Sequence, residues 1–75
     1  MNYIKESFSY KLTFIGGKEL FMEGHRGISK CTESEIVIKV RGGKISIHGE
    51  ELHVKEINED ELFVQGKMEA FGVIK

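Results

Sequence analysis

The chain contains no proline and no tryptophan, and it has one cysteine among its 75 residues. In the absence of proline, the nine glycines are the residues that mark turns and the ends of strands. Glycines placed between short apolar runs are typical of strands joined by turns. The single cysteine, Cys31, cannot form an internal disulfide. A lone thiol indicates a reducing compartment, so the cytoplasm is the expected location.

The sequence also lacks long apolar runs and any large excess of charge. No stretch approaches the roughly 20 apolar residues that a membrane-spanning helix needs, and residues 1–7 lack the apolar core of a signal peptide. Eleven basic and twelve acidic residues give a net charge of −1. Nothing in that balance calls for nucleic acid or an anionic membrane, so we expect a soluble cytoplasmic protein.

The length bounds the size of the core. A domain of this size buries only about 60% of the surface of its unfolded chain, which leaves little stability to spare. We therefore expect a homo-oligomer. Residues 1–9 carry no clear periodicity and are expected to form an N-terminal arm, whereas residues 10–75 are expected to form a single β domain.

A β-hairpin is the clearest local prediction, and it covers residues 35–48. Ile36, Ile38 and Val40 alternate with residues of the opposite face, and Gly42-Gly43 suits a two-residue turn. That turn places apolar residues opposite each other, namely Val40 with Ile45 and Ile38 with Ile47. Because side chains alternate with period two, a slip of one residue would destroy the match.

Three further turns are expected along the chain. A three-residue loop at 16–18 sets Phe14 opposite Leu20, Leu12 opposite Met22 and Lys11 opposite Glu23. A turn at Gly49-Glu50 would return the chain onto 43–48, and a loop at 58–60 sets Val54 opposite Val64. Residues 45–49 also faintly echo 62–66, as two strands with similar exits. The pattern predicts an all-β fold, an antiparallel meander of short strands rolled into a small sandwich or barrel-like sheet.

The densest polar cluster is Glu23-Gly24-His25-Arg26-Gly27. It is a candidate interaction loop, in which glycines free the backbone while Glu23, His25 and Arg26 face a partner. A bulge whose polar side chains simply face water explains the same residues.

A metal site finds no support in the spacing of potential ligands. His25, His48 and His53, with Cys31, form no paired-ligand motif. The predicted register also places His48 and His53 beside lysines, which disfavour a cation. We expect neither a metal nor any other cofactor.

One outer face of the predicted sheet collects positive charge from Lys39, Arg41, Lys44 and Lys55. This is a candidate basic face for phosphate, RNA or an acidic partner. Glu50, Glu51 and Glu56 offset the charge nearby, and the face lacks the aromatic residues on which single-strand binders stack bases. A solvated sheet surface is therefore the favoured interpretation of these residues.

Two phenylalanines, Phe21 and Phe63, stand out of phase with the apolar residues around them. Both are expected on the outer face, Phe21 next to Thr13 and Phe63 near Lys55. Exposed phenylalanines on a sheet indicate a covered surface, so this pair is a candidate interface with another subunit. A sandwich with both faces buried is the alternative.

No serine lies in a Gly-x-Ser-x-Gly turn, and no set of nucleophile, base and orienting residue can be assembled. We expect no enzymatic activity and no small-molecule substrate.

Read in order, four segments resemble the YabP/YqfC family of small sporulation proteins of endospore-forming bacteria, and the YqfC branch more closely. These are residues 13–16, 20–28, 45–57 and 62–68, and the resemblance spans about residues 10–71. It implies a protein made in the mother cell during spore formation, without a known activity or catalytic residues. It also makes a membrane-associated sporulation protein a plausible partner.

The leading hypothesis is therefore a non-enzymatic structural or adaptor protein of endospore formation that acts through protein contacts. The alternative is a small β-barrel that binds nucleic acid through its basic face, although nucleic acid is the less expected partner.

Overall fold

The computed structural model describes residues 10–74 of the chain. The arm expected at residues 1–9 lies outside the described residues. Between residues 10 and 74 the chain forms strands and no helix, namely β1 (Lys11–Ile15), β2 (Glu19–Glu23), β3 (Ile28–Cys31), β4 (Glu35–Val40), β5 (Gly43–Ile57) and β6 (Glu61–Ile74). The prediction of an all-β fold is confirmed.

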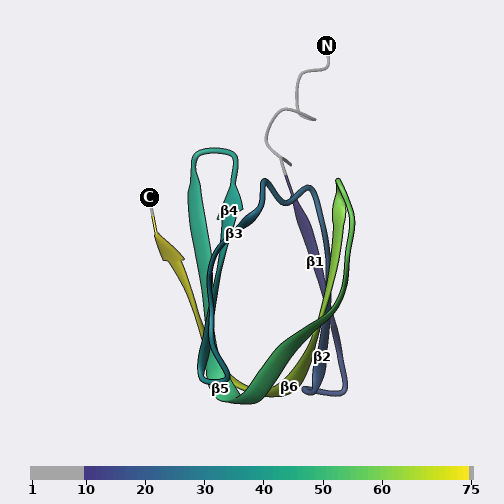
Figure 1. The fold of residues 1–75 in the computed structure, drawn as a ribbon, viewed down its shortest axis with the longest axis vertical. Coiled ribbons are helices and arrows are strands. Elements are labelled where there is room, and N and C mark those ends of the chain that lie inside the picture. Colours follow the sequence, from purple (N-terminus) through teal and green to yellow (C-terminus); the bar gives the residue numbers. More distant parts are fainter. Residues whose placement is uncertain (1–9, 75) are drawn as a thin grey trace.

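All six strands belong to one antiparallel sheet with the order β1-β2-β6-β5-β4-β3. Figure 1 shows that the sheet is bent into a U, and it does not close into a barrel. We call the two arms of the U leaves. The first leaf contains β1, β2 and the paired stretches 53–57 of β5 and 61–65 of β6. The second leaf contains β3, β4 and the stretches 43–48 of β5 and 70–74 of β6.

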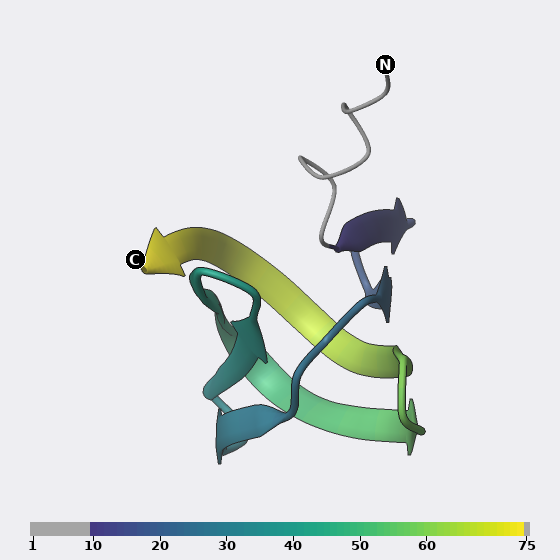
Figure 2. The ribbon, with the colours of Figure 1, turned by 90° about the horizontal axis from the view of Figure 1, so that it is seen from above.

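The strand order departs from a simple meander at one place. β2 pairs with β6 and not with β3, which follows it in the chain. Residues 24–27 carry the chain across from the first leaf to the second, and Figure 2 shows this crossover running between the leaves. The two leaves are thus joined by the bent strands β5 and β6 and, separately, by the crossover.

Two glycines allow β5 and β6 to pass from one leaf to the other. A Cβ atom at Gly49 would lie 1.9 Å from the carbonyl oxygen of Lys67, and a Cβ at Gly66 would lie 2.7 Å from that of Glu51. Gly66 also has a φ of 135°, which favours glycine. The pairing of β5 with β6 is irregular at this bend, with register shifts between His48 and Gly49 and between Glu50 and His53. Bulges of this kind bend strands sharply.

The turn predicted at Gly49-Glu50 is wrong. The chain does not reverse there, because β5 bends and runs on through these residues to a total length of 15 residues. Ile47 consequently pairs with Phe71 of β6 on one side and with Ile36 of β4 on the other. The glycine that was expected to end a strand instead lets two backbones come close, so these strands are longer than predicted.

The register predicted for the hairpin of β4 and β5 is wrong by two residues. The observed pairs are Ile38 with Ile45, Ile36 with Ile47 and Val40 with Gly43. The two-residue turn is therefore Arg41-Gly42, with Gly42 at a φ of 87°. A turn with positive φ only at its second central residue favours glycine at that position. A shift of two leaves every side chain on its predicted face.

The predicted hairpin of β1 and β2 is confirmed, since Phe14 pairs with Leu20 and Leu12 with Met22, as the loop at 16–18 requires. The hairpin of β5 and β6 is confirmed in part. Val54 pairs with Val64 as predicted, but a register shift between Val54 and Glu56 sets Ile57 opposite Leu62, where a three-residue loop at 58–60 would set it opposite Glu61. In that turn the Asn58 side-chain oxygen accepts hydrogen bonds from the backbone N–H groups of Asp60 and Glu61, at 3.0 and 2.8 Å.

The core lies between the leaves. The first leaf and the bend contribute Leu20, Met22, Leu52, Leu62 and Val64, and the second leaf contributes Ile36, Ile38, Val40, Ile45 and Ile47. Two outer positions differ from the prediction, because Val37 and its partner Ser46 are also buried. The predicted division into one apolar and one charged face is therefore incomplete in the second leaf.

Candidate functional site

The residue expected to lead the interaction loop, His25, is buried, with 8% of its surface exposed. Its Nδ1 atom accepts a hydrogen bond of 3.0 Å from the backbone N–H of Gly27. Nε2 must then carry the proton, and it donates a 2.7 Å bond to the carbonyl oxygen of Asn58. The imidazole joins the crossover to the turn between β5 and β6. His25 is held inside the fold, so the expectation that its side chain faces outward is corrected.

The neighbours of His25 are tied to both leaves by backbone bonds. Gly24 donates a 2.8 Å bond to the carbonyl of Asp60 in the first leaf, and Arg26 donates a 2.7 Å bond to that of Lys39 in the second. The Arg26 side chain is exposed, and Glu23 ends β2 half-buried, opposite Lys11 and Glu61. The candidate interaction loop is therefore held in place by backbone hydrogen bonds, and Arg26 is its exposed side chain.

Phe21 and Phe63 lie side by side on the outer face of the first leaf. They are paired directly across β2 and β6, with ring centroids 6.3 Å apart and planes at 85°. Thr13 pairs with Phe21 on the other side, and the Lys55 ammonium lies 5.3 Å from the centre of the Phe63 ring. Both rings are half-buried. We call Phe21, Phe63 and Lys55 the outer aromatic patch.

The four basic residues do not share one face. Lys39 and Lys44 are paired directly across β4 and β5 in the second leaf, and Arg41 lies in the turn that joins those strands. Lys55 lies near the far end of β5, in the first leaf, where it covers Phe63. Since the outer faces of the two leaves point in opposite directions, the predicted basic face is divided (Figure 1).

An apolar strand edge that the sequence reading did not single out lies at the end of β6. Residues 67–74 continue past the last contacts with β2 and the loop before it, and among residues 10–74 no strand lies beside one edge of this stretch. Its large side chains are exposed, with Phe71 at 46%, Val73 at 63% and Ile74 at 47%. Phe14 of β1 packs against Phe71 with ring centroids 4.5 Å apart. We call residues 70–74 the β6 edge.

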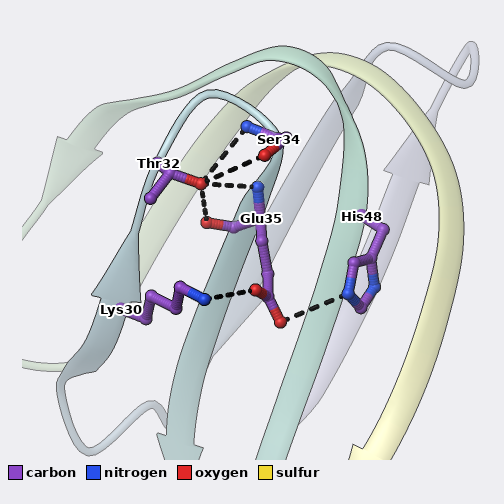
Figure 3. A network of polar contacts seen from close by, with 5 residues as sticks. All are labelled: Lys30, Thr32, Ser34, Glu35 and His48. Atoms are coloured by element: carbon purple, nitrogen blue, oxygen red, sulfur yellow. Dashed lines mark hydrogen bonds and ion pairs between the residues drawn. The ribbon is translucent and has the colours of Figure 1, made fainter.

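A polar network occupies the outer face of the second leaf near the turn between β3 and β4 (Figure 3). The Glu35 carboxylate accepts a 2.7 Å bond from the Lys30 ammonium, and its other oxygen lies 3.2 Å from His48 Nε2. Thr32 Oγ1 accepts a bond from the Glu35 N–H at 2.9 Å. The Lys30 bond and charge, with His48 beside it, hold the pKa of the Glu35 carboxyl below its ordinary value of 4.5. The network stabilises the turn between β3 and β4, and no ligand-binding position is evident within it.

Among residues 10–74, no group of three or more histidine, cysteine, aspartate or glutamate side chains could hold a metal ion. His48 faces Glu35, His53 faces Gln65, and Cys31 is exposed on β3. An open groove of about 1190 Å³ lies at the bend, lined by residues such as Lys18, Glu51 and Met68.

The part of the chain that the structure describes includes no helix of the length and apolar character needed to cross a membrane.

Comparison with known proteins gives two matches. The model of the YabP family matches residues 6–72. An uncharacterised protein, YqfC of Bacillus subtilis (strain 168), is 25% identical over 65 residues, which are 87% of this chain and 70% of that protein. No solved structure matches significantly.

Proposed function

Because the chain belongs to the YabP family, we propose that it is a non-enzymatic structural or adaptor protein of endospore formation. It works in the cytoplasm of the mother cell, where it associates with copies of itself and with a membrane-associated sporulation protein. The resemblance to the family supports the role in endospore formation and the location in the mother cell. The exposed apolar surfaces of the sheet support an action through protein contacts.

The outer aromatic patch carries the proposal. Phe21 and Phe63 lie on the outer face, while their chain neighbours Leu20, Met22, Leu62 and Val64 fill the core. Aromatic side chains are enriched where proteins touch each other, since they supply large contact areas at little cost in conformational entropy. Lys55 adds a cation above Phe63, which suits a partner surface that combines apolar and acidic groups.

The division of the basic residues weakens the alternative of a nucleic-acid-binding protein. Lys39, Arg41 and Lys44 remain together in the second leaf, but the two phenylalanines that could stack bases lie in the first. A strand of nucleic acid would have to contact both leaves to use the phosphate contacts and the stacking together.

The test is capture of partners from sporulating cells with a tagged chain, comparing the wild type with the double variant Phe21→Thr/Phe63→Thr. Threonine keeps the strand preference of these positions while removing the rings. Ile57→Thr is the matched control, since Ile57 is a half-exposed apolar residue outside the patch. We expect the double variant alone to lose a membrane-associated partner. Equal capture by all three proteins would refute a role for the patch.

A further inference from the structure

The β6 edge differs from the other free strand edges of the sheet. Free edges usually carry charged residues, irregular pairing or very few residues, which prevents other strands from adding to them. β1 has Lys11, β3 has four residues with Lys30 among them, and the free stretch of β5 carries Lys55 and Glu56. The β6 edge reads Ala70-Phe71-Gly72-Val73-Ile74, without a charge.

The pairing beneath this edge is also regular. From Lys44 with Ile74 to His48 with Ala70, the register of β5 and β6 runs without a shift. A flat, regular strand with apolar residues is a good template for another strand, because its free N–H and C=O groups are evenly presented. Phe71 and Val73 are the partners of the buried Ile47 and Ile45, so an added strand would extend the core face of the second leaf.

We infer that the β6 edge pairs with the β6 edge of a second copy of this chain, in an antiparallel contact with two-fold symmetry. This inference refines the self-association included in the proposed function. In such a contact the same surface serves both copies. The second leaves of the two copies would form one continuous sheet.

The side chains favour one register for this pairing. If Gly72 of one copy faces Gly72 of the other, Phe71 faces Val73 and Ala70 faces Ile74. Every opposed pair is then apolar, and the small residues Ala70 and Gly72 allow the strands to approach closely. A shift of two residues toward the start of β6 would place Glu69 opposite Val73.

Charge complementarity supports a second copy as the occupant. One end of the second leaf is basic, with Lys39, Arg41 and Lys44, all exposed. The other end has an excess of acidic residues, with Glu33, Glu50 and Glu69 exposed near the bend and Lys67 as a cation 3.9 Å from Glu69. An antiparallel pairing places the basic end of each copy beside the acidic end of the other. Lys44 pairs with Ile74, so it would lie two strand spacings, about 10 Å between backbones, from the partner's strand beside Glu69.

The first experiment measures the molar mass of the full chain by light scattering over a range of concentrations. Val73→Lys places a charge on the β6 edge at an exposed position, and Ile57→Lys is the matched control on β5. We expect the wild type and Ile57→Lys to dimerise and Val73→Lys to remain monomeric. Circular dichroism verifies that each variant folds. A folded Val73→Lys variant that dimerises like the wild type would overturn the inference.

The second experiment tests the register by disulfide formation in a Cys31→Ser background. Two variants, Phe71→Cys and Val73→Cys, are oxidised separately and as a mixture. Directly opposed residues in antiparallel strands lie close enough for a disulfide. We expect the mixture to cross-link and each variant alone to cross-link poorly. Equal cross-linking in all three samples would overturn the register.

Failure of this inference is distinguishable from failure of the proposed function. A wild-type chain that dimerises together with a folded Val73→Lys variant that also dimerises overturns the pairing of two β6 edges alone, whereas a monomeric wild type overturns the self-association in the proposed function as well. Capture of a partner through the outer aromatic patch would be unaffected, because Phe21 and Phe63 lie in the other leaf. A monomer whose β6 amides are protected from hydrogen exchange would show that this edge is covered within the chain, which also contradicts the inference.

Discussion

His25 and Asn58 are joined by a 2.7 Å hydrogen bond from the imidazole Nε2 to the backbone carbonyl, across 33 positions of sequence. This contact joins the crossover to the turn between β5 and β6. The leaves also meet through the rings of Phe14 and Phe71, whose centroids are 4.5 Å apart. One of these contacts is therefore a part-buried hydrogen bond and the other a half-exposed aromatic pair.

His25→Ala is expected to lower the free energy of unfolding by about 2–3 kcal/mol, because it leaves the Gly27 N–H and the Asn58 carbonyl without their partner. Urea denaturation followed by circular dichroism measures the change. His53→Ala is the control, since His53 is exposed, and it should cost less than about 0.5 kcal/mol. Equal losses in the two variants would contradict a structural role for His25.

Gly49→Ala is expected to cost several times more stability than Gly17→Ala. At Gly49 the new Cβ would overlap the Lys67 carbonyl, so the bend must open. At Gly17 there is open space, and only the φ of 71° opposes a side chain, at a cost of about 1–2 kcal/mol. Thermal unfolding of both variants tests the comparison. A well-folded Gly49→Ala variant with a melting temperature close to that of Gly17→Ala would show that the bend tolerates a wider separation.

Glu35 is expected to make stability depend on pH in acid. Its pKa in the folded chain is lowered by Lys30, so the stabilisation is complete above the ordinary value of 4.5 and disappears as pH falls through the folded pKa. The difference in unfolding free energy between the wild type and Glu35→Gln should therefore shrink as the solution is acidified. Lys30→Gln, which removes the main cause, should flatten this dependence. A constant difference across the acid range would rule the ion pair out as its source.

Lys39→Glu is expected to stabilise the chain by up to about 1 kcal/mol, since it replaces two directly opposed positive charges by an opposite pair with Lys44. Lys39→Gln should fall between the two. Because both side chains are exposed, added salt should reduce the difference. Chemical denaturation at low and high salt provides the measurement, and a destabilised Lys39→Glu variant would indicate that the lysine makes another favourable contact.

Local periodicity was sufficient for much of the fold. The alternation around residues 16–18 gave the register of β1 with β2, and the pair Val54 and Val64 followed from the turn at 58–60. The hairpin at Gly42 was placed two residues away from its true register, because both registers keep the same side chains facing the core. Only the choice of turn separates them, and either pair of residues there includes a glycine.

The bend and the crossover could not be predicted in this way. In sequence, a glycine in a turn at the end of a strand cannot be distinguished from a glycine that allows another backbone to approach. Gly49 is of the second kind, because the carbonyl oxygen of Lys67 lies close to where its Cβ would be. The same limitation applies to the candidate sites. His25 is buried in contact with Asn58, far along the chain, whose carbonyl oxygen accepts its hydrogen bond, and Val73 is exposed because no strand among residues 10–74 lies on its side of β6. Phe21 and Phe63 lie on the outer face, as predicted, since that prediction needed only the alternation of side chains along a strand.

The pairing of β2 with β6 determines when the molecule can become complete during synthesis. Leu20 and Met22 leave the ribosome well before their neighbours Val64 and Leu62 are made. The hairpin of β1 and β2 must therefore wait, with apolar side chains unprotected, until β6 arrives. Such non-local pairing slows folding and lengthens exposure to aggregation. A nascent chain stalled before Leu62 would lack the strand that joins β1 and β2 to the rest of the sheet.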